Sequence, residues 1–407
     1  MMAELRQPVW INAEDVPPLP VGWRSLPTAE ACIQLKPGKL FDSKTVAESG
    51  RIPVLNQSET GFLGYHDEEP GVTASPEAPV VTFANHTCAM RPMKQPFSSI
   101  QNIFPKIGKP GVTETIYFYY AALGRVGLSD YKGHHPVFRQ AYIPIPPLPI
   151  QRRIAGILSA YDELIENSQR RIKILEAMAR ALYREWFVHF RFPGHESVPR
   201  VPSPLGDIPQ GWEVKPFTEI ADVLSGGTPK TDVPEYWNGE TPFFTPRDAP
   251  DCFYVQDTDK HVTALGLSKC ASDLYPPDTV FITARGTVGK VAIPAVSMAM
   301  NQSCYALRGK TGFPQRFVFL MTLQQVDYLK TNTGGATFDT IVVDTFRRME
   351  VIKPASDIIA SFANKADAIF DQVKTLQSQT QNLRRTRDLL LPRLLSGQID
   401  VEALNHA

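Results

Sequence analysis

Residues 154–186 read IAGILSAYDELIENSQRRIKILEAMARALYREW, a stretch with no proline and one glycine. Apolar residues recur along it at alternating steps of three and four, which places them on one seam of a helix and is typical of a coiled coil. The seam positions are Leu158, Tyr161, Ile165, Ser168, Ile172, Leu175, Ala179, Leu182 and Trp186. At about 1.5 Å per residue, this helix would span roughly 50 Å.

The same seam returns 208 residues further along the chain. Its positions there are Ala366, Ile369, Val373, Leu376, Thr380, Leu383, Arg387, Leu390 and Leu394. Ser168, Thr380 and Arg387 interrupt the apolar pattern, so the pairing is expected to be marginal without neighbouring contacts. Two ordinary amphipathic helices, each packed on its own domain, are the alternative. Such helices typically run for 8 to 20 residues, so the greater length favours a helix pair.

The duplication extends beyond the two helical stretches. Matching segments, in chain order, are Pro20-Val21-Gly22-Trp23 with Pro209-Gln210-Gly211-Trp212, Ile52-Pro53-Val54 with Thr241-Pro242-Phe243, and Phe138-Arg139-Gln140 with Phe346-Arg347-Arg348. The offset is 189 for the first two pairs and 208 for the third. The second copy is therefore expected to carry insertions between these anchors.

Each half opens with short β-branched and aromatic runs between turn residues, such as 78–83 and 279–283, which predict strands. We therefore expect an α+β fold, in which two strand-rich domains are joined by two long antiparallel coiled-coil helices in a pseudo-two-fold duplication. The expected boundaries are 1–150 for the first domain, 151–192 for a central spacer helix, 193–355 for the second domain, and 356–407 for a C-terminal spacer helix and tail.

Composition narrows the function classes. The chain has 407 residues, 43% hydrophobic and 21% charged, which argues against disorder. No apolar run approaches the roughly 20 residues of a membrane span, and residues 1–10 lack a signal-peptide core, so no membrane contact and a cytoplasmic location are expected. The 42 basic and 42 acidic residues cancel, so a DNA-binding surface would have to be a local patch.

Catalytic and metal-binding motifs are mostly missing. The five cysteines are scattered and odd in number, so we expect small hydrophobic side chains rather than disulfides or zinc ligands. The string 286–290 resembles the end of a phosphate-binding loop, but Val291 stands where Ser or Thr should follow. His134 and His135 have no partner cluster and predict a surface turn. No catalytic residue, cofactor or metal is therefore expected.

Polar and basic residues in the predicted loops suit DNA instead. Arg can pair with guanine, and Asn or Gln with adenine, while Lys and Thr suit phosphates. In the second half the candidates are Thr228, Lys230, Arg247, Arg285, Thr287, Lys290, Asn301 and Gln302. In the first half they are Lys36, Lys39, Asn56, Gln57, Arg91 and Lys94. The alternative is that they are solvated and that Asn301 caps a turn. Four helix residues, Arg152, Arg153, Arg170 and Arg171, fit either role.

Further landmarks, in chain order, lie at 146–154, 211–214, 225–230, 243–248, 284–290, 300–303 and the tail 390–399. Over nearly the whole chain these segments resemble the specificity subunits of type I restriction–modification systems, with Ile150 standing where the family usually has Glu. The first half departs from the landmarks. Ala84-Asn85-His86 stands in place of the Arg285-Gly286-Thr287 segment, and Asn56-Gln57-Ser58 in place of Pro246-Arg247-Asp248.

The resemblance implies a non-catalytic subunit in which two target-recognition domains bind a bipartite, asymmetric site in double-stranded DNA. It also implies two modification subunits that carry S-adenosylmethionine and the methyl transfer, and restriction subunits with helicase and nuclease activity. Two alternatives remain open at this point. One is a coiled-coil adaptor that binds no DNA, and the other is an autonomous methyltransferase.

Overall fold

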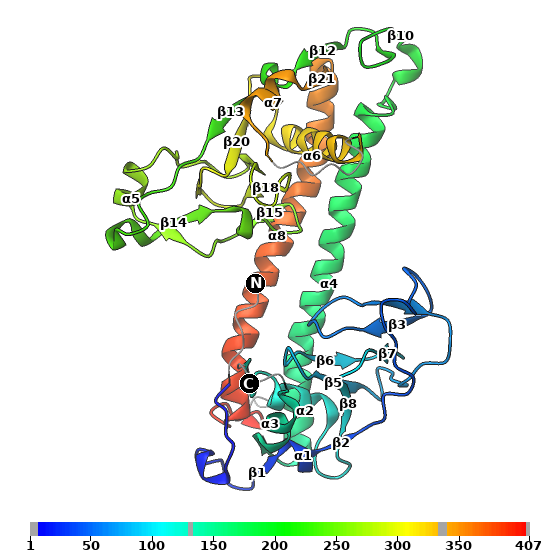
Figure 1. Cartoon of the computed structure of the whole chain (residues 1–407), viewed down its shortest axis with the longest axis vertical. Coiled ribbons are helices and arrows are strands. Elements are labelled where there is room, and N and C mark those ends of the chain that lie inside the picture. Colours follow the sequence, from blue (N-terminus) through cyan, green and yellow to red (C-terminus); the bar gives the residue numbers. More distant parts are fainter. Residues whose placement is uncertain (1–6, 129–132, 333–339, 404–407) are drawn as a thin grey trace. The chain divides into compact units, whose positions relative to one another are not determined.

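The computed structural model describes residues 7–128, 133–332 and 340–403. Side chains are described for these residues except 328–332. The chain forms two compact units, Met1–Ile165 with Asn382–Ala407, and Glu166–Gln381. Two helices, α4 (Leu148–Phe187) and α8 (Ser356–Leu395), each run for 40 residues and contribute to both units (Figure 1). Their ends are offset by the same 208 residues as the seam. The expected long helices are confirmed.

The ends of these helices follow from local sequence. Pro149 lies in the first turn of α4, where a missing backbone N–H costs nothing. The second helix begins at Ser356 with Asp357 in its first turn, where a negative charge is favourable. It ends just before Ser396-Gly397, and Gly397 has a φ of +72°, the left-handed conformation common after a helix.

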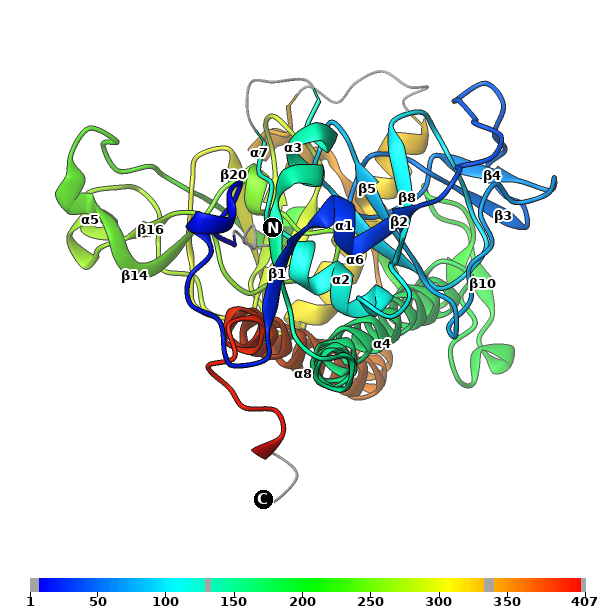
Figure 2. The same ribbon diagram turned by 90° about the horizontal axis from the view of Figure 1, so that it is seen from below.

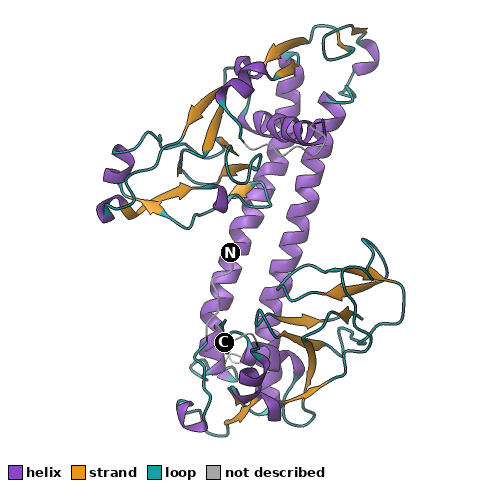
Figure 3. Cartoon of the chain, in the orientation of Figure 1, coloured by secondary structure: helices purple, strands orange, loops and turns teal. Residues whose placement is uncertain are grey.

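Over its described residues, the first unit contains three sheets (Figure 3). The largest has the order β2 (Cys32–Gln34), β8 (Ile103–Gly108), β5 (Val80–Ala84) and β6 (Met90–Met93). The second has the order β4 (Gly64–His66), β3 (Ile52–Leu55) and β7 (Ser98–Ser99), and the third pairs β1 (Arg24–Pro27) with β9 (Tyr142–Ile145). The remaining elements before α4 are η1 (Ala13–Asp15), α1 (Thr28–Ala31), α2 (Thr115–Ala122) and α3 (His135–Gln140).

The core of the first unit follows from the period-two alternation of strand β5. Val81 and Phe83 point to one face, where α2 packs together with the adjoining ends of α4 and α8 (Figure 2). Val80 points to the other face and shares a core cluster with Leu55 of the smaller sheet and with Phe97, which precedes β7. The four-stranded sheet therefore has a helical layer on one side and a second sheet on the other.

The part of the second unit that the structure describes has four sheets. The largest has the order β13 (Ala221–Ser225), β20 (Cys304–Gly309), β17 (Val280–Thr283), β18 (Val291–Pro294) and β15 (Tyr254–Val255). Next come β16 (His261–Val262), β14 (Trp237–Phe244) and β19 (Ala299–Met300), then the pairs β12 (Glu213–Pro216) with β21 (Glu350–Lys353) and β10 (Arg200–Val201) with β11 (Ile208–Pro209). Its helices are α5 (Ala264–Ser268), α6 (Gln315–Asn332), α7 (Val343–Arg348), η2 (His195–Ser197), η3 (Phe217–Glu219), η4 (Pro234–Tyr236) and η5 (Pro246–Asp248).

The two units repeat the same topology. The order β2-β8-β5-β6 becomes β13-β20-β17-β18, and β4-β3-β7 becomes β16-β14-β19, with β15 added in the second unit. The middle strand pairs antiparallel with one neighbour and parallel with the other in both cases. The predicted duplication is confirmed, and part of the expected insertion lies in β15 and α5.

The predicted seam is confirmed in both helices, because every one of its positions is buried or half-buried. In the first unit Leu158 of α4 shares a core with Leu394 of α8. In the second unit the rings of Phe187 and Phe362 lie 4.9 Å apart. Residues near the start of α4 therefore lie opposite residues near the end of α8, and the reverse holds at the other ends. The two helices are antiparallel. Each helix also packs on its strand-rich domain, as the alternative interpretation expected.

The expected surface turn at His134 and His135 is wrong. His134 is 4% exposed, and its Nδ1 lies 2.9 Å from the Asn85 carbonyl oxygen. His135 stacks on Phe104 with ring centroids 3.7 Å apart, and its Nε2 lies 3.0 Å from Lys106 Nζ. Burial, with the Lys106 charge beside it, lowers the pKa of His135 to about 4. Both histidines are therefore packing residues at the start of α3, whose Phe138 belongs to the first core.

All five cysteines are free, with Cys32 and Cys304 buried and the others half-buried. Among the described helices, none combines the length and the apolar character that crossing a membrane requires.

Candidate nucleic-acid interface

In the second unit, backbone hydrogen bonds tie four loops together at one end of the two main sheets. Gly227 N donates to Met300 O at 3.0 Å, which joins the loop after β13 to the β19 end. Asn301 N donates to Phe244 O at 3.0 Å, and Ala284 N donates to Ser303 O at 2.7 Å. These bonds bring the loops after β13, β14, β17 and β19 to one place. All eight predicted residues of the second half lie on this loop cluster or at its edge.

Two glycines make this close approach possible. A Cβ atom on Gly226 would lie 2.1 Å from the Asn301 carbonyl oxygen, and one on Gly227 would lie 2.6 Å from Ala271 N. No side chain fits at either position, because the obstructing atoms belong to the backbone. The two glycines of this segment, Ser225-Gly226-Gly227-Thr228-Pro229-Lys230, therefore lie where the backbones of neighbouring loops are in contact. Thr228 and Lys230 follow them, half-buried and exposed respectively.

The β17–β18 turn presents Arg285 and Thr287 to solvent. The Thr283 hydroxyl accepts from Lys290 N at 2.9 Å and donates to the Thr287 carbonyl, so it closes the base of the turn. Gly286 at the apex has a φ of +79°, a conformation that favours glycine. Arg285 and Thr287 on either side of it are exposed. The turn is thus fixed by its own polar groups and leaves the Arg285 side chain at the surface.

The other predicted residues of this cluster differ in how their polar groups are used. Arg247 is exposed. Lys290 Nζ lies 3.1 Å from Asp251 Oδ1, and Thr228 donates to the side-chain oxygen of Gln302. Asn301 Oδ1 accepts from Ser303 N at 3.1 Å, which is the turn-capping role weighed as its alternative. Arg247 and Arg285 therefore present exposed guanidinium groups on this cluster.

The first unit repeats the loop cluster with different side chains. Ile100 N donates to Leu55 O at 3.1 Å, the counterpart of the bond between Asn301 and Phe244. Asn85 N donates to Asn102 O at 3.0 Å, the counterpart of the bond between Ala284 and Ser303. The loops after β3, β5 and β7 therefore meet as their counterparts do.

This equivalence corrects the residue matching drawn from the sequence. Because Leu55 corresponds to Phe244, Asn56 matches Thr245 rather than Pro246. Because the last residue of β5, Ala84, corresponds to Thr283, His86 takes the position of Arg285. The sequence comparison placed the segment near Asn56 one residue out of register, since no shared residue type marks it.

His86, Thr87 and Asn102, which the sequence reasoning missed, surround the predicted Gln57 in the loop cluster of the first unit. Gln57 Oε1 accepts from His86 N at 2.9 Å, and Gln57 Nε2 donates to Gln101 O at 3.4 Å. Thr87 donates to the Gln57 carbonyl, and Asn102 Nδ2 lies 3.2 Å from His86 Nε2. The segment Ala84-Asn85-His86 was noticed only as a departure from the family landmarks. The positive φ of Asn102, +67°, could not be read from the sequence.

The remaining first-half candidates do not all join this cluster. Asn56 Oδ1 accepts from Ser58 N at 3.0 Å within its own turn. Arg91 donates to Gly61 O at 2.7 Å across Phe62, and burial lowers the pKa of its guanidinium. Lys36 is exposed on the loop after β2.

Two lysines of the first half are paired with carboxylates. Lys39 Nζ lies 2.6 Å from Glu68 Oε1, with both side chains largely exposed. Lys94 Nζ lies 2.7 Å from Glu163 Oε1 on α4, so Lys94 is directed at the helix and not at the loop cluster. On the same helix, Arg152, Arg170 and Arg171 are exposed and Arg153 is half-buried.

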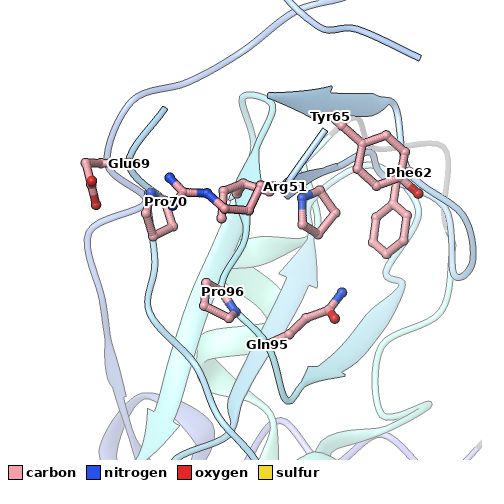
Figure 4. Close-up of a pocket in the computed structure, with 9 residues that line it drawn as sticks. Arg51, Phe62, Tyr65, Glu69, Pro70, Gln95 and Pro96 are labelled. Atoms are coloured by element: carbon pink, nitrogen blue, oxygen red, sulfur yellow. The ribbon is translucent and has the colours of Figure 1, made fainter. Parts of the chain in front are cut away.

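A hollow of about 480 Å³ lies on the β3–β4 hairpin of the first unit (Figure 4). Its lining consists of Arg51, Ile52, Pro53, Phe62, Tyr65, Glu69, Pro70, Gln95 and Pro96. The backbone N of Arg51 donates to Asp67 Oδ1 at 2.8 Å. None of the predicted DNA-binding residues lines this hollow, so it is separate from the loop cluster.

Comparison with known proteins finds one family. Residues 21–177 and 209–384 both match the type I restriction modification DNA specificity domain. The chain is 27% identical over 185 residues to the type I restriction enzyme MjaIX specificity subunit of Methanocaldococcus jannaschii, covering 44% of this chain and 43% of that protein. It is 25% identical over 315 residues to the HindI specificity subunit of Haemophilus influenzae, covering 63% of this chain and 68% of that protein.

The fold has a counterpart among solved structures. The crystal structure of the S subunit of a type I restriction-modification system from M. genitalium superposes with a TM-score of 0.60 at 15% identity, covering 92% of this chain and 96% of that one. Since the two family matches span most of the sequence, this chain belongs to the type I restriction modification DNA specificity domain family and contains two copies of that domain.

Proposed function

We propose that this chain is the specificity subunit of a type I restriction–modification complex and recognises a bipartite DNA sequence. The observation that carries the proposal is the loop cluster, built twice by the same backbone hydrogen bonds and furnished with different side chains each time. A repeated scaffold with different side chains suits two half-sites that differ in sequence. The family membership and the names of the relatives support the same function.

In the proposed mode of binding, each loop cluster enters the groove of one half-site. Arg285 and Arg247 are the proposed base readers of one half, because a guanidinium can pair with two acceptors of guanine. Lys230, Thr287 and Lys290 are proposed to contact phosphates, together with Thr228, Asn301 and Gln302 at the cluster edge. Lys36, Lys39, Asn56, Gln57 and Arg91 are the proposed counterparts in the other half.

The proposed complex supplies the chemistry from other chains. Two modification subunits would dock, one on each half, and would carry S-adenosylmethionine and the methyl transfer. Restriction subunits would add ATP-driven translocation and DNA cleavage. The present chain would be non-catalytic and would act in the cytoplasm, where the DNA is. The proposed division into recognition domains 1–150 and 193–355, with spacer helices 151–192 and 356–407, serves this assembly.

The experiment is methylation-aware genome sequencing of cells that carry the gene together with its modification subunits, compared with the same cells after deletion of the gene. We expect one bipartite, asymmetric methylated motif that disappears with the gene. A methylation pattern that is identical in both strains contradicts the proposal. A coiled-coil adaptor without DNA binding predicts that result, together with no salt-dependent DNA binding by the purified complex.

A further inference from the structure

The turn that carries Arg247 is closed by the carboxylate of the next residue, Asp248. Asp248 Oδ2 accepts from Thr245 N at 2.8 Å and from Thr245 Oγ1 at 2.6 Å. The backbone N of Asp248 donates to Thr245 O at 3.0 Å, so both the side chain and the backbone of Asp248 bind Thr245. These bonds close the single turn η5, and Arg247 lies exposed at its middle. The backbone from which the Arg247 side chain extends is therefore fixed by Asp248.

The other carboxylate oxygen of Asp248 binds a second loop. Asp259 N donates to Asp248 Oδ1 at 3.0 Å. The loop that contains Asp259 is itself attached to strand β14, because Phe243 N donates to Thr258 Oγ1 at 2.9 Å. Asp248 therefore connects the Arg247 turn to a loop that is anchored on the strand immediately before that turn.

The hydrogen bonds around Asp248 favour a carboxylate over an amide. Both of its oxygens accept, and two of the donors, Thr245 N and Asp259 N, are backbone groups that cannot rotate. Asparagine would direct an amide nitrogen, which only donates, at one of these two N–H groups. Hydrogen bonds from backbone N–H groups to an ionised carboxylate are also stronger than those to a neutral oxygen. Asp248 is therefore suited to hold both loops at once.

The first unit builds the matching turn without a carboxylate. Asn56 corresponds to Thr245, and its Oδ1 accepts from Ser58 N at 3.0 Å. The side chain that closes this turn comes from its first residue, whereas in the second unit it comes from the last. Residues 56–60 contain no arginine. The carboxylate and the arginine therefore occur together, in one half only.

We propose that Asp248 is a positioning residue for base reading in the second half-site, where it fixes the turn from which Arg247 contacts a base. The inference rests on the proposed function and specifies it, because it names the group that makes the Arg247 contact selective. Two parallel hydrogen bonds from a guanidinium to a guanine require a defined distance and direction. A turn that is free to move would let the same guanidinium bind phosphates or other bases, so discrimination would fall more than affinity.

The test uses the full chain in complex with its modification subunits and DNA duplexes in which each base pair of the second half-site is changed in turn. We expect Arg247→Ala to lose discrimination at one base pair by about 5- to 100-fold. Asp248→Ala should lose discrimination at that same base pair, with the first half-site read as before and the affinity for an unrelated duplex not reduced. The double variant should lose no more discrimination than Arg247→Ala alone. Asp207→Ala is the matched control, since Asp207 is exposed on the connection between β10 and β11, away from β14 (Figure 1).

The outcomes separate this inference from the function on which it rests. If Asp248→Ala discriminates as wild type does at the base pair that Arg247→Ala no longer reads, the inference is wrong and the proposed function stands. The same conclusion follows if Asp248→Ala weakens binding to every duplex alike, or if Arg247→Ala itself loses no discrimination. If wild type prefers no sequence at all, both fail.

Thr245 provides a second pair of variants in case Asp248→Ala does not fold. Thr245→Val removes the hydroxyl that donates to Asp248 Oδ2, whereas Thr245→Ser keeps it. We expect Thr245→Val to lose discrimination at the Arg247 base pair and Thr245→Ser to retain it. Equal discrimination by these two variants also overturns the inference.

Discussion

Arg387 of α8 donates a hydrogen bond to Asp162 of α4, and Tyr120 of α2 donates to the second carboxylate oxygen of Asp162 at 2.6 Å. Arg387 is only 9% exposed and also contacts Asp388 at 2.8 Å. In the sequence, Arg387 stands as an interruption of an apolar seam. In the structure it is a charged seam residue with a partner on the facing helix, and that partner, Asp162, also binds Tyr120 of the first strand-rich domain.

Replacing Arg387 by Met should destabilise the chain by about 1–3 kcal/mol, because the carboxylate of Asp162 then stays in the interface without its cation. The double variant Asp162→Asn/Arg387→Met should cost less than the sum of the two single changes, with a coupling of about 0.5–3 kcal/mol. Urea unfolding of the four proteins measures this. The matched control is Glu166→Ala on the exposed side of α4. If the losses in the free energy of unfolding of the two single variants simply add up in the double variant, Arg387 and Asp162 do not stabilise the chain as a pair.

Glu176 of α4 predicts a pH dependence of stability. It is 7% exposed, its Oε1 accepts from Phe253 N at 2.7 Å, and burial raises its pKa from 4.5 to about 7. A raised carboxyl pKa means that between pH 4.5 and about 7 the folded chain holds a proton that the unfolded chain has released. The free energy of unfolding therefore falls as pH rises through this interval, by up to about 3 kcal/mol.

Glu176→Gln keeps an oxygen acceptor for Phe253 N and removes the titration. We expect it to become more stable relative to wild type as the pH is raised from 4 to 8. Glu166→Gln, on an exposed part of the same helix, should show no such trend. Urea midpoints measured at both pH values provide the comparison. A constant difference between Glu176→Gln and wild type over this range would show that Glu176 does not titrate there.

Much of the fold could be predicted because it depends on patterns that survive duplication. The seam positions predicted an offset of 208 residues, and the ends of α4 and α8 differ by this same number. Burial of Arg387 could not be predicted, since it depends on Asp162, which lies on the other helix. The mistaken surface turn at His134 has the same cause. Its buried position is fixed by Asn85, far away in the sequence.

The candidate site was predictable only where glycines mark loops. Ser225-Gly226-Gly227-Thr228 and Arg285-Gly286-Thr287 stand out in the second half because close contacts and a positive φ require glycine there. The first half uses Asn102 at positive φ and His86 in place of Arg285, and neither residue type signals a binding turn. The side chains that differ between halves are the ones the sequence identified least well.

Arg285→Ala and Arg247→Ala should each weaken binding to the specific duplex by about 1–3 kcal/mol if the guanidinium pairs with two acceptors of a base. The loss should be smaller for a duplex with a different base pair at the contacted position. Arg308→Ala is the matched control, since Arg308 is 61% exposed near the end of β20 remote from the loop cluster. Anisotropy titrations at fixed salt measure the affinities. Unchanged affinity and sequence preference in both variants would remove these arginines from the interface.

The purified chain on its own should neither bind S-adenosylmethionine nor methylate DNA, because its sequence predicts no cofactor site. Calorimetric titration with S-adenosylmethionine and a methyl-transfer assay on genomic DNA test this. Adding the modification subunits should restore transfer at the bipartite motif. Methyl transfer by the chain without those subunits would favour the autonomous methyltransferase instead.

The length of the helices leads to a prediction about the spacing of the half-sites. Each of α4 and α8 is continuous over 40 residues. If they act as a spacer, the unspecified gap in the DNA site is a geometric consequence of helix length, since duplex DNA repeats about every 34 Å. The compact units meet along the chain at Ile165/Glu166 and at Gln381/Asn382. These two places are where an insertion lengthens the spacer and leaves both loop clusters intact.

Inserting four residues after Asn167 adds about 6 Å if the insert is helical and rotates the downstream part of α4 by about 40°. Such a stutter unwinds a helix pair locally and does not remove its seam. We expect both half-site sequences to be kept while the gap between them lengthens by one or more base pairs. A matching insertion after Gln381 lengthens both helices equally, so every methylated site should then have the same longer gap. Methylation-aware sequencing measures the gap, with Asn167→Ala as control. A folded insertion variant that binds with the original gap would show that other contacts position the domains.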